Sequence, residues 1–218
     1  MQPQDYNQKQ EAYFSRARLD IIPLFPAHAN SVLEIGCGNG ATLRYLQGEG
    51  RCTTIDGIEL MESVALEAKP YLNTMWIGDA EEIITTLEDE RYDAILCLDV
   101  LEHLVDPWKF VAQLSRVLKT GGVVIASIPN LRTFKVIANL TFFGRFTYAD
   151  QGIMDRTHLR FFTKKSALHL LETKTLTVDN WNHSPFAPWS KSAIVNALSV
   201  GLVRDFLTEQ YLVRALKK

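Results

Sequence analysis

The segment Val32–Gly40 reads VLEIGCGNG, and it decides the fold more than any other part of the chain. It begins with the apolar residues of a strand buried on both faces, and then places glycines at alternate positions, Gly36, Gly38 and Gly40. Glycine permits positive φ and a close approach of the backbone, so the N–H groups of such a turn can contact a ligand. We therefore expect a strand, a ligand-binding turn and a helix in this order. A tight turn without a ligand is the alternative.

Two classes of ligand fit this glycine pattern. The spacing Gly36-x-Gly38-x-x-Ala41 also satisfies the pattern of dinucleotide-binding turns. Glu34, however, places a carboxylate two residues before the first glycine, where a pyrophosphate would gain nothing from a negative charge. A cationic ligand would gain from it, so we favour a positively charged ligand.

Length and composition favour one domain. The chain has 218 residues, of which 47% are hydrophobic, enough to fill one sizeable core. We expect a single domain over residues 1–218, with an N-terminal helical cap over 1–28 and acceptor-side insertions over 130–162 and 184–208. The formal net charge of -2 gives no general reason to expect nucleic-acid binding.

The cysteines and the N-terminus indicate a cytoplasmic protein. Cys37, Cys52 and Cys97 are odd in number and have no C-x-x-C spacing, so we expect reduced thiols and no metal. The first ten residues, MQPQDYNQKQ, have no apolar core of a signal peptide. No stretch reaches the roughly 18 apolar residues that a transmembrane helix needs.

The glycine segment with its preceding acid resembles motif I of the class I S-adenosylmethionine (SAM)-dependent methyltransferases, in which this loop cradles the methionine half of the cofactor. The resemblance extends over residues 12 to about 182, and it is closest to small bacterial methyltransferases encoded beside surface-polysaccharide genes. It implies SAM as cofactor and S-adenosylhomocysteine as product. It also implies a three-layer, doubly wound α/β fold with a seven-stranded, mostly parallel sheet whose last strand is antiparallel.

The hydrophobic pattern places the other elements of this fold. After the first strand, we expect strands at Cys52–Glu59, Thr74–Ile77, Tyr92–Leu98, Val123–Ile128, Leu176–Asn182 and Gln210–Leu216. We expect helices at 5–24, Ala41–Leu46, Glu62–Lys69, Pro107–Leu118 and Lys164–Leu171, a turn at Gly121–Gly122, and a helical insertion at Pro188–Leu207.

Polar residues follow several of these strands and supply candidate cofactor contacts. Glu59 lies about 20 residues past the glycine loop, where a carboxylate can take both ribose hydroxyls of SAM or of NAD. By the resemblance, Asp79 accepts from the adenine amino group, although an ordinary helix N-cap is the alternative. The full predicted cofactor set is Tyr13, Arg18, Glu34, Gly36, Cys37, Gly38, Asn39, Gly40, Glu59, Leu60, Gly78, Asp79, Ala80, Leu98, Asp99 and Val100.

Two histidines are candidates for the catalytic base. His103 lies in the segment DVLEHL, which resembles motif IV, and His158 lies in DRTHLRFFT, which resembles a segment of the same small bacterial enzymes. A neutral imidazole has a pKa suited to removing a proton from an acceptor hydroxyl or amine. A structural role is the alternative for both.

Three further residues are candidates for binding the acceptor. Arg156 and Arg160 could grip an anionic acceptor through paired donors, unless they only organise their loop. Trp189 could line an acceptor pocket, although buried aromatic residues at a hairpin base are more common.

The segment between Asn130 and Lys164 is long for a loop and combines basic with aromatic residues. It fits an anionic or lipid-linked acceptor held at a membrane surface. It also fits a substrate lid with a packed aromatic underside, which we favour from the sequence.

The sequence thus predicts a SAM-dependent methyltransferase that acts on an O or N atom of a small-molecule or carrier-bound acceptor, such as a saccharide or lipid-linked one. Peripheral contact with a membrane is left open, and no nucleic-acid partner is expected. One alternative is an NAD-dependent oxidoreductase, because Glu59 and the glycine spacing fit that cofactor as well. The other is a methyltransferase-like binding protein without turnover.

Overall fold

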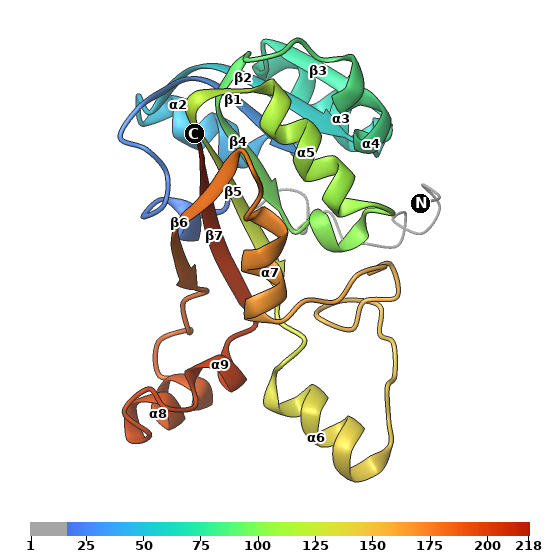
Figure 1. The fold of residues 1–218 in the computed structure, drawn as a ribbon, viewed down its shortest axis with the longest axis vertical. Helices are drawn as coiled ribbons and strands as arrows, with labels where there is room; N and C mark the ends of the chain where they lie inside the picture. Colours follow the sequence, from blue (N-terminus) through green and yellow to red (C-terminus); the bar gives the residue numbers. More distant parts are fainter. Residues whose placement is uncertain (1–16) are drawn as a thin grey trace.

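The computed structural model describes residues 17–218, and Tyr13 lies outside that range (Figure 1). Its strands are β1 (Ala29–Ile35), β2 (Cys52–Glu59), β3 (Thr74–Ile77), β4 (Tyr92–Leu98), β5 (Leu118–Pro129), β6 (Leu176–His183) and β7 (Gln210–Lys217). They form one sheet in the order β3-β2-β1-β4-β5-β7-β6. The first five strands are parallel, and β7 runs antiparallel to both of its neighbours. The predicted fold class is confirmed.

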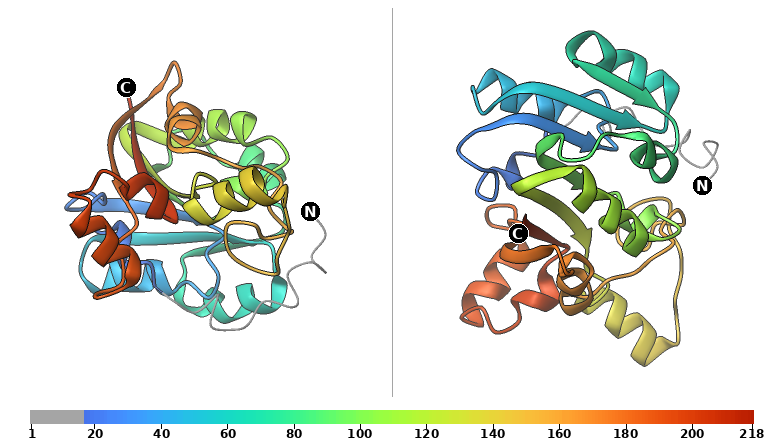
Figure 2. Two further views of the ribbon diagram at one scale, coloured as in Figure 1. Left: turned by 90° about the horizontal axis from the view of Figure 1, so that it is seen from below. Right: turned by 45° about the horizontal axis from the view of Figure 1, so that its top comes forward.

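Helices cover both faces of this sheet, as seen from below in Figure 2. The α-helices are α2 (Ala41–Gly48), α3 (Glu62–Ala68), α4 (Ala80–Ile83), α5 (Pro107–Val117), α6 (Phe134–Phe143), α7 (Lys164–Leu171), α8 (Lys191–Leu198) and α9 (Arg204–Leu207). Helices α5 and α7 pack on one face of the sheet and α2 packs on the other, which gives two apolar clusters. Adjacent residues of β1 contribute to different clusters, Val32 to one and Leu33 to the other. The strand is therefore buried on both faces, as its sequence indicated.

This topology fixes the position of the site. The strand order reverses direction at β1 and β4, so their following loops diverge and leave a crevice at the carboxyl ends of the strands. The glycine turn follows β1, and it is anchored to the neighbouring strand because Gly36 and Cys37 both donate their N–H groups to the carbonyl of Ile58. The residues that follow β2 and β4 lie beside it.

Three predicted elements differ from the structure. Strand β5 begins at Leu118, so the predicted turn at Gly121–Gly122 is instead an irregularity inside the strand, where its register with β4 shifts and Gly121 has a φ of 79°. The helical insertion is divided into α8 and α9. Of the predicted helix over 5–24, the described part contains only one short 3-10 helix, η2 (Leu19–Ile21), and Pro23 follows it closely.

Helix α6 was not predicted, because its sequence shows no polar face. The seven apolar residues among the ten of this helix are distributed around it, so the helical period gives no apolar stripe to recognise. The helix ends at Gly144, which adopts the left-handed conformation common after helices. Helices α6, α8 and α9 project beyond the end of the sheet at which β5 ends (Figure 1).

Among the described residues 17–218, no helix has the length and hydrophobicity of a membrane-spanning segment.

Candidate active site

A cavity of about 480 Å³ lies over the carboxyl ends of β1, β2 and β4. Thirteen of the sixteen predicted cofactor residues line it: Arg18, Glu34, Gly36, Cys37, Gly38, Glu59, Leu60, Gly78, Asp79, Ala80, Leu98, Asp99 and Val100. Asn39 and Gly40 lie in the glycine turn but outside this lining, and Tyr13 is not among the described residues. Residues from four separate loops therefore meet at one cavity.

The glycine turn needs its glycines for two physical reasons. Gly36, Gly38 and Gly40 have φ values of 66°, 55° and 77°, which L-residues with a Cβ rarely adopt. A Cβ on Gly36 would also lie 2.9 Å from Cγ2 of Val100, a residue of the same cavity. The turn after β1 therefore packs so closely against the loop after β4 that a side chain at position 36 would not fit.

Glu34 is the acidic residue that the sequence placed beneath this turn, and its side chain is only 3% exposed. Burial raises its pKa from 4.5 to about 8, while Thr42 and the charge of Arg18 act in the opposite direction. Oxygen Oε2 of Glu34 is buried and has no hydrogen-bond partner among the described residues. A buried carboxylate that lines a cavity and keeps one oxygen without such a partner is suited to a cationic ligand.

Glu59 closes the opposite side of the turn. Its Oε2 accepts a hydrogen bond of 2.9 Å from the backbone of Gly38, and its Oε1 accepts one of 3.0 Å from the backbone of Met61. Burial raises the pKa of Glu59 above its ordinary value, and these backbone donors offset only part of the increase. Each carboxylate oxygen keeps a further lone pair, so the side chain is held in place and can still accept from a ligand.

Arg18 and Asp99 form the side of the cavity nearest β5. Nη1 of Arg18 contacts Oδ2 of Asp99 at 2.5 Å, and Asp20 binds the same guanidinium group. Ser127 and Gln210 both donate to Oδ1 of Asp99, at 2.9 and 2.7 Å. Asp99 has a φ of 59°, an unusual value for a residue other than glycine, and this network stabilises it.

Asp79 combines the two roles considered from the sequence. It is the N-cap of α4, because its Oδ1 accepts a hydrogen bond of 2.8 Å from the backbone of Glu81. The same residue lines the cavity. Glu81 in turn accepts from the backbones of Val105 and Asp106, which ties the loop after β3 to the loop after β4.

A second, larger space, a groove of about 1190 Å³, adjoins the cavity on the side of the insertions. Asp99 and Gln210 line both spaces, whereas Glu102, Asp155 and His158 line the groove alone. Segments from α6 and from the loop over 145–155 complete it. An acceptor in the groove would therefore lie next to whatever the cavity holds.

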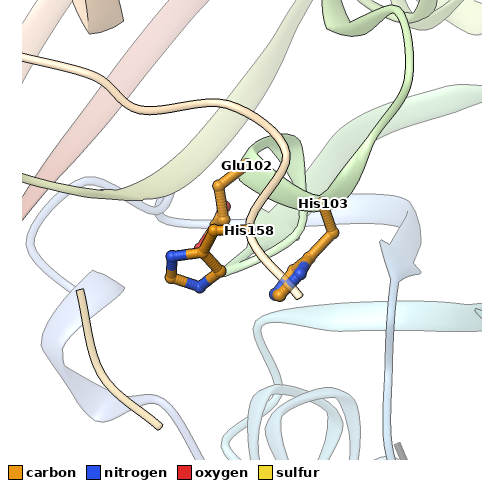
Figure 3. A group of neighbouring side chains, drawn as sticks. All are labelled: Glu102, His103 and His158. Atoms are coloured by element: carbon orange, nitrogen blue, oxygen red, sulfur yellow. The ribbon is translucent and has the colours of Figure 1, made fainter. Parts of the chain in front are cut away.

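The two candidate bases are neighbours, although 55 positions separate them in the sequence. The ring centroids of His103 and His158 are 4.7 Å apart, with an angle of 72° between the planes. Nδ1 of His103 lies 3.0 Å from the carbonyl of Thr157, and Nδ1 of His158 lies 3.0 Å from the carbonyl of Ile153. Both rings are 8% exposed, and Glu102 beside them is 1% exposed (Figure 3).

The three predicted acceptor residues lie outside the groove lining. Arg156 pairs with Asp150 at the surface, and Arg160 donates to the carbonyl of Val105. Trp189 is 90% exposed. The structure therefore does not bring these three side chains to the two histidines.

Several residues of the site could not be found from local sequence. Thr42, Ile58 and Glu81 line the cavity but belong to ordinary-looking helix or strand segments, and Gln210 reaches it from the start of β7. Of these residues, Gln210 alone had a recognisable position, at the start of a predicted strand. Strand β7 runs antiparallel to β5, so its first residue lies at the end of the sheet where β5 ends. Glu102 could be identified from the sequence in the segment DVLEHL. Its contact with the loop that carries Leu159 and Arg160, more than 50 residues away, could not.

Comparison with known proteins agrees with this geometry. A family model described as a methyltransferase domain matches residues 33–126. Ubiquinone biosynthesis O-methyltransferases of Serratia proteamaculans and Thiobacillus denitrificans are each 32% identical, over 106 and 111 residues. These matches cover 47% and 48% of this chain, and 44% and 47% of the relatives. The chain thus spans about half the length of the curated relatives it matches.

Solved structures share the fold over almost the whole chain. A chain in the complex between the Trm112 methyltransferase activator and the putative methyltransferase of Haloferax volcanii has a TM-score of 0.67 at 12% identity, covering 98% of this chain and 93% of that one. A SAM-dependent methyltransferase from Archaeoglobus fulgidus has a TM-score of 0.62 at 20% identity, with coverage of 95% and 92%. Residues 33–126 thus match a methyltransferase domain, and the chain shares the fold of these methyltransferase structures.

Proposed function

We propose that this chain transfers the methyl group of SAM to a hydroxyl oxygen of an acceptor in the groove. The observation that carries the proposal is the buried carboxylate of Glu34, whose Oε2 has no hydrogen-bond partner among the described residues and which lines the cavity beneath the glycine turn. A cation stabilises such a carboxylate, and SAM carries two cationic groups, a sulfonium and an ammonium. A nicotinamide dinucleotide would bring phosphates to the same turn instead.

The cavity-lining residues suit the parts of this cofactor. Glu34, Arg18 and the backbone of the glycine turn would hold the methionine half, Glu59 the ribose hydroxyls and Asp79 the adenine end. When bound, SAM supplies an activated methyl group that needs no further activation by the protein. The remaining task of these residues is to align the acceptor oxygen with the methyl carbon and to exclude water.

The acceptor atom is assigned to oxygen for two reasons. The curated relatives that match the chain carry the name O-methyltransferase. A hydroxyl oxygen becomes a much stronger nucleophile when it loses its proton, and the wall between cavity and groove holds His103 and His158, residues suited to that step. The proton therefore leaves at the end of the groove where the two histidines lie.

We further propose that the acceptor is bound to a carrier at an anionic lipid surface. Helix α6 has no buried residue, and Phe142 and Phe143 are 76% and 65% exposed, so the packed aromatic underside expected of a lid is not formed. The helix contains Lys135 and no acidic residue, and Arg145 follows it. Exposed aromatic residues beside cations are typical of peripheral membrane contacts. Helix α6 also lines the groove, so an acceptor could enter from that surface.

Calorimetry with the full chain tests the proposed function. We expect S-adenosylhomocysteine to bind one site per chain and NAD to show no saturable heat. Incubation of SAM with phenolic acceptors, both free and lipid-linked in anionic vesicles, should then yield methyl ethers, identified by mass spectrometry. Binding of NAD without binding of S-adenosylhomocysteine would overturn the proposal. Cofactor binding without methylation of hydroxyl or amine acceptors would instead support a binding protein without turnover.

A further inference from the structure

Glu102, His103 and His158 form a compact cluster between the cavity and the groove. Each residue can present one ligand atom, and these three atoms lie within 4.8 Å of one another. Glu102 and His103 come from the turn after β4, whereas His158 comes from a distant loop, and the three side chains converge (Figure 3). Two imidazoles and one carboxylate are the donor set of many divalent transition-metal sites.

The hydrogen bonds of the two histidines orient them for this role. A backbone carbonyl can only accept, so Nδ1 of His103 donates to Thr157 and Nδ1 of His158 donates to Ile153. In each neutral ring, Nε2 therefore carries the lone pair. A donor bond from the second ring nitrogen to a carbonyl is the usual support of a metal-binding histidine.

The backbone holds the cluster together as well. The N–H groups of Leu159 and Arg160 both donate to the carbonyl of Glu102, at 2.9 Å. Asp155 is 3% exposed, and its Oδ1 accepts from both the backbone and the hydroxyl of Thr157. The loop that carries His158 is thus fastened directly to the turn that carries Glu102.

We propose that Glu102, His103 and His158 bind a divalent first-row transition cation, such as Mn²⁺. Bonds of about 2.0–2.2 Å to each ligand require donor atoms about 3–4 Å apart. The present spacing of the three donors, within 4.8 Å of one another, is close to that distance. The expectation of no metal rested on cysteine spacing, which says nothing of imidazole and carboxylate donors.

The position of the cluster suggests that the cation activates the acceptor hydroxyl; this role depends on the methyl transfer proposed above. His103 lines the cavity, while Glu102 and His158 line the groove. The cation would bind the acceptor hydroxyl and lower its pKa, which replaces the base role considered for the two histidines, and the proton passes to solvent water. A lone pair of the resulting oxygen then forms the bond to the methyl carbon as the carbon–sulfur bond breaks. The products are the methyl ether and neutral S-adenosylhomocysteine.

Metal binding is tested on the full chain after dialysis against EDTA, with SAM absent. Titration with Mn²⁺, followed by the electron paramagnetic resonance of free Mn²⁺, should give one site per chain. Glu102→Gln and His158→Gln should each weaken binding by about ten-fold or more. His169→Gln is the matched control, because His169 is a histidine on α7, away from the cluster. It should bind Mn²⁺ as the unmodified chain does.

A second measurement keeps the test valid if a variant does not fold. Co²⁺ bound to the unmodified chain should give visible absorption bands that differ from those of hexaaquo Co²⁺. Absence of a stoichiometric site for both Mn²⁺ and Co²⁺ would overturn the proposal. So would unchanged Mn²⁺ affinity in both folded cluster variants.

The two proposals fail separately. If S-adenosylhomocysteine does not bind while Mn²⁺ does, the proposed function is wrong and the metal site stands. If methyl transfer proceeds equally fast in EDTA and in Mn²⁺, the role given to the cation is wrong, while the methyltransferase assignment stands. Loss of turnover in EDTA with recovery in Mn²⁺ supports both.

Discussion

Arg18 and Asp99 are 81 residues apart in the sequence and form an ion pair of 2.5 Å at the rim of the cavity. The pair joins the segment before β1 to the loop after β4, and Gln210 of β7 adds a third segment through its bond to Asp99. Three distant parts of the chain are thereby fixed around the end of the cavity that meets the groove.

Replacing Asp99 should weaken this junction. We expect Asp99→Asn to lower the free energy of unfolding by about 1–3 kcal/mol, because it removes a charge-assisted bond from a largely buried guanidinium group. Arg18 would keep only Asp20 as an acidic partner within hydrogen-bonding distance among the residues from 17 onward. Affinity for S-adenosylhomocysteine should also fall. Urea unfolding and calorimetry measure the two effects.

The pair between Arg156 and Asp150 is the matched control. Both side chains are mostly exposed, so Asp150→Asn should change the free energy of unfolding by less than about 1 kcal/mol. Equal losses in the free energy of unfolding for Asp99→Asn and Asp150→Asn would show that the buried network stabilises the fold no more than a surface ion pair does.

The raised pKa of Glu34 gives a pH dependence with a definite sign. Between pH 4.5 and about 8, the folded cofactor-free chain keeps a proton on Glu34 that the unfolded chain has released. The contribution to stability is therefore complete below pH 4.5 and is lost as the pH rises through 8. Glu34→Gln should flatten this part of the curve in urea unfolding at a series of pH values.

The same group should couple cofactor binding to pH. A cationic ligand favours the ionised carboxylate, so SAM should displace a proton from Glu34 below pH 8, and its affinity should rise with pH across this window. Calorimetry in buffers of different ionisation enthalpy measures the released proton. Proton release of the same size in Glu34→Gln would contradict the assignment.

Gly36 should tolerate no side chain. We expect Gly36→Ala to lower the free energy of unfolding by about 1–3 kcal/mol, because the residue has positive φ and its Cβ would lie 2.9 Å from Val100. Cofactor affinity should fall as well, since this residue lines the cavity. Thermal unfolding with and without S-adenosylhomocysteine separates the two effects.

Gly48 provides the comparison, because it lies in α2 and a Cβ added there would meet no other side chain within 4 Å. Gly48→Ala should leave stability unchanged or raise it by up to about 1 kcal/mol. A loss in Gly48→Ala as large as that in Gly36→Ala would contradict the explanation from backbone conformation.

Helix α6 should determine binding to lipid. Phe142→Ser combined with Phe143→Ser should reduce co-sedimentation with vesicles that contain anionic phospholipid, and high salt should reduce it further. Leu66→Ser is the control, because Leu66 is 53% exposed but belongs to α3 at the other end of the molecule (Figure 1). Absence of vesicle binding by the unmodified chain would overturn the proposed lipid surface.

Local sequence was sufficient for most of the regular elements. The bounds of β2, β3, β4 and α7 agree with those predicted. Strand β4 is a largely apolar, buried run, and the helix begins after the capping Thr163. Helix α6 was missed because an exposed apolar helix lacks the polar face that reveals helical period.

For the site, the sequence by itself determined the chemistry of each strand end. The glycine turn, Glu34 and Glu59 were recognisable because backbone freedom and charge are local properties. Only the tertiary structure decided which side chains meet. His103 and His158 became neighbours, and Gln210 joined Asp99, through contacts between segments far apart in the chain. Such contacts depend on how strands are ordered in the sheet and how loops pack across its edge, and no local pattern of residues encodes that order.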